Sequence, residues 1–389
     1  MITKRRIAFI RWGSFSHIND CVQEILERHF VDAQIDVIDI NELIPKSNPL
    51  SYLHALRSYG HDVARRRKTL SEARERTPFV FQTVRRRLLE RLNRHPYDFT
   101  FQTQSMFDGS KPGTPHFVYT DCTYLANLHF PDFSHRDLPI EAWMQCERSI
   151  YEHATKVFAM SHNIADSLIS DYDCPADKVA LVYCGANAQT SKDERFGTER
   201  YAKKRILFVG IDWRRKGGPA LVEAYKKVLK AHPDASLTVV GCSPRINLPN
   251  CNVVGMIPLP EVKKYFENAT LFCLPTLLEP FGVVFLEAMA HGLPIVATRL
   301  GAIPDFVIEG QNGHLVEPNN SEQIADRISA LLSEPAQIER YGDFGHSLYW
   351  RRYTWEQTGV RICDHIEAAL GYQGDATASR PHEVAGCKA

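Results

Sequence analysis

Apolar residues along the chain gather in short runs that alternate with longer amphipathic stretches. In the N-terminal part, the runs Arg6–Ile10 and Ile35–Ile40 predict two strands, and the stretch Asn19–Phe30 between them predicts a helix. Two further short strands are predicted at Phe99–Gln102 and His116–Thr120. The chain therefore opens as a β-α-β unit, the usual beginning of a parallel sheet.

A second series of strands and helices follows further along the chain. Its predicted strands are Arg205–Gly210, Ser236–Gly241, Asn252–Gly255, Thr270–Leu274 and Pro294–Thr298. Helices are predicted between and after them at Gly218–Lys230, Pro260–Asn268, Val283–Ala290, Glu322–Leu332 and Trp355–Leu370. This alternation predicts a parallel sheet that binds ligands at the carboxyl ends of its strands.

The domain boundary is predicted in the polar stretch between the two series. A chain of 389 residues is long enough for two domains, and Gln189–Lys204 shows no apolar periodicity. The predicted segments are an N-terminal domain at 1–190, a linker at 191–204, a second domain at 205–350, a terminal helix at 351–370 and a tail at 371–389. The tail is rich in Gly, Ala, Ser and Pro, which predicts disorder.

The composition is that of an ordinary globular protein. Hydrophobic residues make up 44% and charged residues 24% of the chain, and 46 basic side chains balance 46 acidic ones. The apolar run Ile7–Ile10 is too short for a signal-peptide core or a membrane span. The ten cysteines include no C-x-x-C pair, which favours reduced thiols over disulfides or a zinc site. We therefore expect a cytoplasmic protein.

The charge is lopsided in one segment, Arg65–Arg94. Eleven basic residues there face three acidic ones, a local net charge of +8. Such a run most often forms a solvated helical face. Apolar residues interleaved with the basic ones make the segment amphipathic, so docking on an anionic membrane surface is the alternative. No recognisable nucleic-acid-binding module accompanies the segment, which argues against a nucleic acid partner.

The strongest chemical signal lies in the stretch Pro275–Gly292. Its predicted helix, Val283–Ala290, is apolar apart from Glu287, and a lone carboxylate in such a helix needs a buried partner or a ligand. A turn from Glu279 to Gly282 leads into the helix start, where free backbone N–H groups favour a phosphate. On a continuous helix the two glutamates would lie about 12 Å apart, too far for the pair of carboxylates in a glycosidase.

A second candidate element follows the strand that ends at Gly210. Lys216, Gly217 and Gly218 open the next helix, where glycines allow close approach to a ligand and Lys216 supplies a positive charge for a diphosphate. The alternative is a surface turn with solvated basic residues. The presence of the Glu279–Glu287 element in the same domain favours the ligand site.

These elements resemble a known family. Glu279, Phe281, Gly282 and Glu287, with the continuation Ala288–Thr298, are similar to the E-x7-E signature of the family 4 retaining glycosyltransferases. The resemblance implies an α/β protein of the GT-B fold, with two Rossmann-like domains facing across a cleft and a C-terminal helix crossing back to the N-terminal domain. It also implies hexosyl transfer from a nucleotide-diphosphate sugar without a metal ion or other cofactor.

The resemblance assigns roles to individual residues. Glu279 would contact the transferred sugar as a catalytic residue, and Glu287 would accept hydrogen bonds from the nucleotide ribose. The expected donor-binding residues are Lys216, Arg214, Arg215, Phe281, Gly282, Val283, Val284 and Glu287. Gly13 and Ser14, in the loop after the first strand, would line the acceptor side, although a plain strand-to-helix turn explains Gly13 equally well.

Two positions depart from the family pattern. The family usually carries a His near the donor sugar where this chain has Asp121, which either replaces the His as a catalytic residue or caps a turn. The family commonly has an Arg at the position of Ile211, so Arg214 or Arg215 supplies the cation or Lys216 acts alone.

These departures keep two other functions open. One is a GT-B sugar-phosphate enzyme, an epimerase or phosphorylase, and the other is a catalytically silent nucleotide-sugar binder. The leading expectation is a glycosyltransferase of polysaccharide biosynthesis that acts on a glycan, lipid-linked or small-molecule acceptor. The basic segment Arg65–Arg94 adds the expectation of peripheral contact with the inner face of an anionic membrane.

Overall fold

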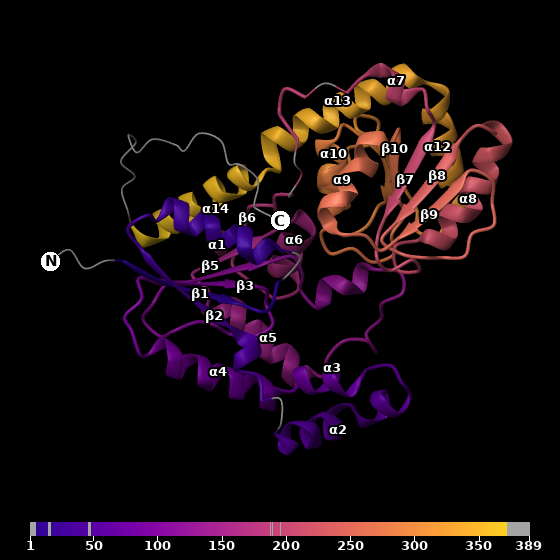
Figure 1. Cartoon of the computed structure of the whole chain (residues 1–389). Helices are drawn as coiled ribbons and strands as arrows, with labels where there is room; N and C mark the ends of the chain where they lie inside the picture. Colours follow the sequence, from indigo (N-terminus) through magenta and orange to yellow (C-terminus); the bar gives the residue numbers. More distant parts are fainter. Residues whose placement is uncertain are drawn as a thin grey trace. The chain divides into compact units, whose positions relative to one another are not determined.

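The chain folds into two compact units, seen in a computed structural model that describes residues 5–14, 17–45, 48–186, 188, 190–194 and 196–371 (Figure 1). Among the described residues, unit 1 comprises the chain up to Leu128, Phe133–Tyr183 and the residues from Gly359 to Gly371. Unit 2 comprises His129–Asp132 and Cys184–Thr358. The tail predicted at 371–389 lies outside the described residues except for Gly371.

Unit 1 is built on a six-stranded parallel sheet with the strand order β2-β1-β3-β4-β5-β6. Its strands are β1 (Arg6–Arg11), β2 (Gln34–Asp39), β3 (Phe99–Thr103), β4 (His116–Thr120), β5 (Lys156–Ala159) and β6 (Val179–Leu181). The first four confirm the strands predicted from the apolar runs. Ile7 of β1 is level with Ile35 of β2 and with Phe99 of β3, so the strand ends lie in step along the sheet.

The helices of unit 1 cover both faces of this sheet. They are α1 (Ile18–His29), α2 (Pro49–Ala64), α3 (Leu70–Glu75), α4 (Pro78–Leu92), α5 (Glu141–His153) and α6 (His162–Ser170), with short 3-10 turns at Ile40–Glu42, Leu125–His129 and Ala176–Lys178. Figure 1 shows α1 on one face of the sheet and α4 and α5 on the other. This two-sided cover explains why the strands are apolar on both faces.

The chain between β2 and β3 forms three helices that the sequence analysis does not separate. Each begins at a polar cap: the Asn48 side chain accepts a hydrogen bond from the N–H of Leu50, Thr69 forms a capping box with Glu72, and Thr77 precedes Pro78. The signals that start these helices are therefore present in the sequence. The expectation of a single helical face across Arg65–Arg94 is wrong because Thr69 and Thr77 divide the segment.

Unit 2 is built on a second six-stranded parallel sheet, ordered β12-β11-β10-β7-β8-β9. Its strands are β7 (Arg205–Val209), β8 (Ser236–Val240), β9 (Cys251–Gly255), β10 (Leu271–Leu274), β11 (Ile295–Thr298) and β12 (Gly313–Val316). Its helices are α7 (Thr198–Tyr201), α8 (Gly218–Ala231), α9 (Leu259–Asn268), α10 (Val283–Ala290), α11 (Ile303–Phe306), α12 (Ser321–Ser333) and α13 (Pro335–Arg352). The five predicted strands and the predicted helices at α8, α9, α10 and α12 are confirmed.

The faces of the second sheet are also covered by helices. Phe272 of β10 packs against Phe266 of α9 at 5.9 Å and against Phe285 of α10 at 5.6 Å, so α9 and α10 share one face. Figure 1 shows α8 and α12 on the other face. The buried side of α13 contains one aliphatic residue, Ile338, and is otherwise formed by glycine, tyrosine and histidine, so its sequence carries little apolar periodicity.

The segment 191–204, predicted as a linker, packs within unit 2. The Arg200 guanidinium donates hydrogen bonds to the carbonyl oxygens of His291 at 2.6 Å and Gly292 at 3.0 Å. Tyr201 is buried. These contacts attach α7 to the end of α10, because the two carbonyl groups follow the last turn of that helix.

The last helix, α14 (Trp355–Leu370), has the predicted bounds. Its residues from Gly359 onward belong to unit 1, whereas Trp355–Thr358 belong to unit 2. Within unit 1, the His29 ring of α1 forms a hydrogen bond with the Glu367 carboxylate of α14 at 2.8 Å. The end of the chain therefore completes the unit that its beginning starts. Within the described residues, every helix is too short or too polar to cross a bilayer.

The core of unit 1 contains a group of packed phenylalanine rings, which gives a test of the fold. Phe117 of β4 stacks on Phe158 of β5 at 5.8 Å and meets Phe99 of β3 edge-on at 5.5 Å, and it is fully buried. We expect Phe117→Ala to lower the free energy of unfolding of unit 1 by about 4 kcal/mol, because burial is lost and a cavity forms. Chemical denaturation followed by circular dichroism measures this change.

The control is Val37→Ala on the edge strand β2, where the side chain is 40% exposed. We expect a change of less than about 1 kcal/mol there. Equal effects of the two substitutions would contradict the packing described for unit 1.

Candidate functional site

The loop after β7 carries Lys216 to the start of α8. Gly217, the residue before the helix, has a left-handed backbone with φ of 74°, and a Cβ atom on it would lie 1.7 Å from the carbonyl oxygen of Pro275. Only glycine fits this position, because both the dihedral and the close approach exclude a side chain. Lys216 is thereby held against the loop that follows β10.

That second loop, 275–282, brings Glu279 to Lys216. The two side chains form an ion pair in which each remains only about a tenth exposed. A buried ion pair is costly to desolvate, and removing one partner leaves the other charge without compensation. The structure therefore brings together two of the predicted site residues, and an entering anion would compete with Glu279 for Lys216.

Hydrogen bonds tie the two loops together around this pair. The Arg215 guanidinium donates to the carbonyl oxygen of Leu278 at 2.8 Å, and the carbonyl oxygen of Arg215 accepts from the N–H of Leu277 at 2.8 Å. The Thr276 hydroxyl also donates to the Arg215 carbonyl at 3.2 Å. Arg215 therefore lies against the Glu279 loop, whereas Arg214 and Ile211 are exposed on the surface of the β7–α8 loop.

The start of α10 offers backbone donors beside this pair. Gly282, at the N-cap, has φ of 94° and supplies no side-chain acceptor, and Val283 and Val284 in the first turn are only partly buried. The N–H of Phe285 donates to the carbonyl oxygen of Gly282 at 3.0 Å, but the N–H groups at the very start of a helix have no intrahelical partner, so those of Val283 and Val284 can bind an anion. Phe281 is buried against Phe306 at 5.7 Å and fixes the entry of the chain into the helix.

Glu287, in the second turn of α10, is a carboxyl group without a protein partner among the described residues. Surrounding protein raises its pKa to about 7, although part of its surface stays accessible. A carboxyl group that is partly protonated near neutral pH can both donate and accept hydrogen bonds. The backbone carbonyl oxygen of Glu287 accepts a hydrogen bond from the His291 ring at 2.8 Å, and this bond holds the end of the helix.

Three predicted residues lie in unit 1, at the carboxyl edge of its sheet. Gly13 and Ser14 follow β1, and Asp121 follows β4. The carbonyl oxygen of Gly13 accepts from the Asn19 side chain at 2.6 Å, while Ser14 is exposed and Asp121 is partly exposed. Because β1 and β4 are separated only by β3, both loops lie at the same edge of one sheet.

The loop that carries Asp121 is held by Glu147, a residue to which the sequence analysis assigns no role. Glu147 is 1% exposed, and its carboxylate accepts from the N–H of Tyr124 at 3.1 Å, from the Tyr151 hydroxyl at 3.1 Å and from the Tyr172 hydroxyl. Burial raises its pKa to about 7. The sequence signal that could have identified Glu147 is its position as a charged residue on the apolar face of α5.

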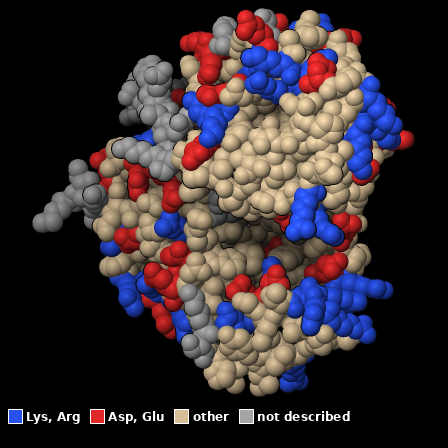
Figure 2. All heavy atoms as spheres, turned by 45° about the vertical axis from the view of Figure 1, so that its right-hand side comes forward, with Lys and Arg blue, Asp and Glu red and all other residues tan. Residues whose placement is uncertain are grey.

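The basic segment Arg65–Arg94 is only partly exposed. Several of its arginines bind within unit 1. Two form ion pairs, Arg85 with Asp108 at 3.0 Å and Arg91 with Glu42 at 2.8 Å. Three donate hydrogen bonds: Arg87 to the Leu43 carbonyl oxygen, Arg74 to the Tyr52 hydroxyl and Arg76 to the Tyr124 hydroxyl. Arg65, Arg66, Arg67, Arg86 and Arg94 are exposed. The segment therefore does not form one solvated face, although Figure 2 shows a group of Lys and Arg side chains on this part of the surface.

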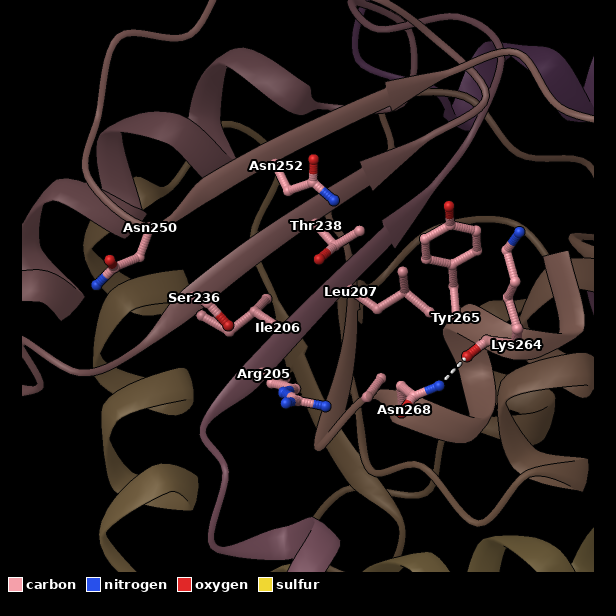
Figure 3. A pocket seen from close by; sticks show the side chains of 11 residues that line it. Arg205, Ile206, Leu207, Ser236, Thr238, Asn250, Asn252, Lys264, Tyr265 and Asn268 are labelled. Atoms are coloured by element: carbon pink, nitrogen blue, oxygen red, sulfur yellow. Dashed lines mark hydrogen bonds between the residues drawn. The ribbon is translucent and has the colours of Figure 1, made fainter.

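A hollow of about 420 Å³ lies elsewhere on unit 2 (Figure 3). Its lining comes from β7, β8, β9 and the end of α9 and includes Arg205, Ser236, Asn252, Lys264 and Asn268. Arg205 begins β7, whereas Lys216 follows the other end of that strand. The hollow is therefore separate from the predicted donor site.

The position of Gly217 gives a test of how the site is built. We expect Gly217→Ala to lower the free energy of unfolding of unit 2 by about 3 kcal/mol, because the new methyl group collides with the Pro275 carbonyl and the backbone is strained. Gly197→Ala is the control, since a Cβ atom there meets nothing within 4 Å. Thermal unfolding measures both, and a Gly217→Ala protein as stable as the control would refute the described approach of the two loops.

The buried Glu147 predicts a pH dependence. Its pKa is about 7 in the folded protein against 4.5 ordinarily, so the folded state holds the proton more tightly. Protonated Glu147 makes its full contribution to the free energy of unfolding below about pH 4.5. This contribution falls as the pH rises through 7, by roughly 3 kcal/mol at most. Denaturation of wild type and Glu147→Gln between pH 4.5 and 8 measures the difference. Parallel pH profiles of the two proteins would contradict it.

Two protein-family models match the chain. Residues 23–190 match the family model described as Glycosyltransferase Family 4, and residues 203–334 match the model described as Glycosyl transferases group 1. Together the two matches span most of the chain.

One relative is a D-inositol 3-phosphate glycosyltransferase of Corynebacterium urealyticum, 28% identical over 281 residues. The match covers 64% of each chain, so this chain spans less than two thirds of that relative's length.

Solved structures show the same fold. Sucrose-phosphate synthase from Thermosynechococcus elongatus superposes with a TM-score of 0.66 at 17% identity, covering 95% of this chain and all of that one. Anabaena HepE, solved in complex with UDP, superposes with a TM-score of 0.61 at 14% identity, covering 93% of this chain and all of that one. The two family matches show that the chain belongs to the family 4 glycosyltransferases, and the two parallel sheets, like the solved structures, show the GT-B fold.

Proposed function

We propose that the protein transfers a hexosyl group from a nucleotide-diphosphate sugar to a glycan, lipid-linked or small-molecule acceptor, with retention of the anomeric configuration. The observation that carries the proposal is the buried Lys216–Glu279 ion pair beside the open start of α10. Both lie at the carboxyl ends of strands, where parallel sheets bind ligands. The complex of HepE with UDP supports a uridine nucleotide as one candidate donor.

The proposed donor site uses basic groups and backbone donors in place of a metal ion. As the anomeric carbon–oxygen bond breaks, its electron pair passes to the diphosphate, whose negative charge increases. Lys216, Arg215 and the first-turn N–H groups of α10 would stabilise this charge, because they are fixed in place before the reaction begins. No general acid is needed for so stable a leaving group.

The ion pair also suggests how the donor enters the site. In the structure Lys216 neutralises Glu279, and a bound diphosphate would take over Lys216 and leave the Glu279 carboxylate to face the sugar. A carboxylate there stabilises positive charge that develops on the sugar ring. Glu287 would bind the ribose hydroxyls through a carboxyl group with a pKa of about 7.

The acceptor side is assigned to unit 1. We propose that Gly13 and Ser14 contact the acceptor and that Asp121 takes the proton of the acceptor hydroxyl group in place of the usual His. Glu147 supports this assignment, because it holds the loop that carries Asp121 through the N–H of Tyr124. The relative that acts on an inositol phosphate makes phosphorylated polyols suitable acceptors for a first screen.

We also propose a place for the protein in the cell. It would act in the cytoplasm in polysaccharide biosynthesis and contact the inner face of an anionic membrane through the exposed part of the Arg65–Arg94 segment. Arg65, Arg66 and Arg67 support this, since all three are exposed next to one another. Basic residues near an anionic membrane surface each contribute about 1 kcal/mol to binding.

Nucleotide release tests the proposed reaction. We expect one donor from a panel of UDP-, GDP- and ADP-sugars to be consumed without added metal, and we expect Lys216→Ala and Glu279→Gln each to lower kcat at least about 100-fold, because each removes a charge that acts on the transition state. Lys226→Ala is the control: this lysine lies on α8 as well, but it is exposed and pairs with Glu223.

The remaining outcomes identify the alternatives. Binding of a nucleotide without turnover in the presence of the acceptor screen would indicate a silent binder. Turnover without a new glycoside would indicate a sugar-phosphate enzyme. Full activity of Glu279→Gln would exclude Glu279 as a catalytic residue.

A further inference from the structure

Helix α2 belongs to unit 1 and exposes a row of leucines on the side that faces away from the rest of that unit. Leu50, Leu53 and Leu56 are 53%, 61% and 50% exposed. Residues three apart in a helix lie next to one another on its surface, so the three side chains form one continuous stripe. The opposite side of α2 is packed through its buried residues Ser51, Ala55 and Tyr59.

This stripe is unusual for the surface of a soluble protein. A single exposed leucine needs no explanation, but an aligned group exposes a contiguous apolar patch, and such patches mark interaction sites. In the described part of the chain, ten large apolar residues are strongly exposed, and three of them belong to this one helix. Their alignment therefore points to a surface that α2 is built to contact.

Basic residues border the leucine stripe. Arg57 is exposed and lies seven residues after Leu50, two helical turns along the same side of α2. Arg65, Arg66 and Arg67 follow the end of the helix and are exposed as well. Within the described residues, Arg57, Arg65 and Arg66 make no ion pair, and Arg67 approaches Asp62 at 3.8 Å.

This surface is chemically complementary to an anionic lipid bilayer. A helix with an apolar stripe and neighbouring arginines lies in the plane of a membrane, where the leucines enter the acyl boundary and the arginines meet anionic headgroups. The same charges disfavour a second copy of the chain, because two such faces would repel each other. Much of the α4 part of the basic segment is engaged elsewhere, as the pairs of Arg85 and Arg91 show.

We propose that α2 docks this protein on an anionic bilayer through Leu50, Leu53, Leu56, Arg57 and Arg65–Arg67. In Figure 1, α2 lies at the lower border of unit 1, away from its sheet. The proposal extends the membrane contact proposed above. The apolar part of that contact comes from α2, which precedes the Arg65–Arg94 segment. It is independent of the donor chemistry.

Vesicle sedimentation tests the proposal with the full-length protein. The vesicles contain either phosphatidylcholine alone or phosphatidylcholine with about 30% phosphatidylglycerol, whose anionic headgroups attract basic side chains. We expect binding to the anionic vesicles only, weakened by salt. The combined change Leu50→Ser, Leu53→Ser and Leu56→Ser should lower the partition coefficient at least about tenfold, since the apolar contribution is lost.

Two further variants separate the contributions. Changing Arg57, Arg65, Arg66 and Arg67 to Gln should remove the salt dependence, because these residues supply the electrostatic attraction. The matched control replaces Val31, Ile169 and Val360 with Ser, three apolar residues of unit 1 that are also exposed but lie away from α2. The control should bind as wild type does, and circular dichroism melting confirms that each variant is folded.

The outcomes that overturn the proposal are specific. Absence of wild-type binding to anionic vesicles, or equal loss in the leucine variant and the control, would refute it. Concentration-dependent dimerisation that the leucine substitutions abolish, without vesicle binding, would assign the stripe to self-association. Nucleotide release in solution is measured separately, so a failure of vesicle binding leaves the proposed glycosyl transfer untouched, and a failure of turnover leaves the vesicle result valid.

Discussion

The buried ion pair between Lys216 and Glu279 is the interaction on which the proposed donor site depends. It forms because β7 and β10 are neighbours in a parallel sheet, so the loops that follow them meet at one edge. Desolvating two charges offsets much of their attraction, and the pair therefore contributes little net stability. The pair provides a cation and a carboxylate that are already dehydrated and in place, while Arg215 holds the two loops together by donating one hydrogen bond and accepting others.

The parts of the fold that follow from periodicity were predictable from the sequence. Strands such as β7 and β10 are continuous apolar runs, and α10 is apolar on nearly every side, so their existence required no tertiary information. The residues of the proposed donor site flank such elements at strand ends, which made their positions in the fold predictable. That Lys216 touches Glu279 could not be predicted, because it depends on which strands become neighbours in the sheet.

Other features were missed because their signal is not apolar. The buried side of α13 consists mostly of glycine, tyrosine and histidine, with Ile338 as its one aliphatic residue, so aliphatic spacing does not reveal this helix. Glu147 lies among buried residues yet is stabilised by tyrosine hydroxyls from different elements, contacts that have no fixed spacing in the sequence. The exposure of the basic segment Arg65–Arg94 could not be predicted either, because the number of charges does not show that Arg85 is turned inward to Asp108.

The assignment of α14 to both units has a consequence for how the protein is made. Unit 1 takes its strands from the first half of the chain but its last helix from the residues after Gly359. A ribosome that has finished β6 has therefore delivered a sheet that still lacks one of its covering helices, and it must synthesise all of unit 2 first. Until then the face that receives α14, including the region of α1 near His29, stays uncovered, so the nascent first domain is the species that chaperones would have to protect.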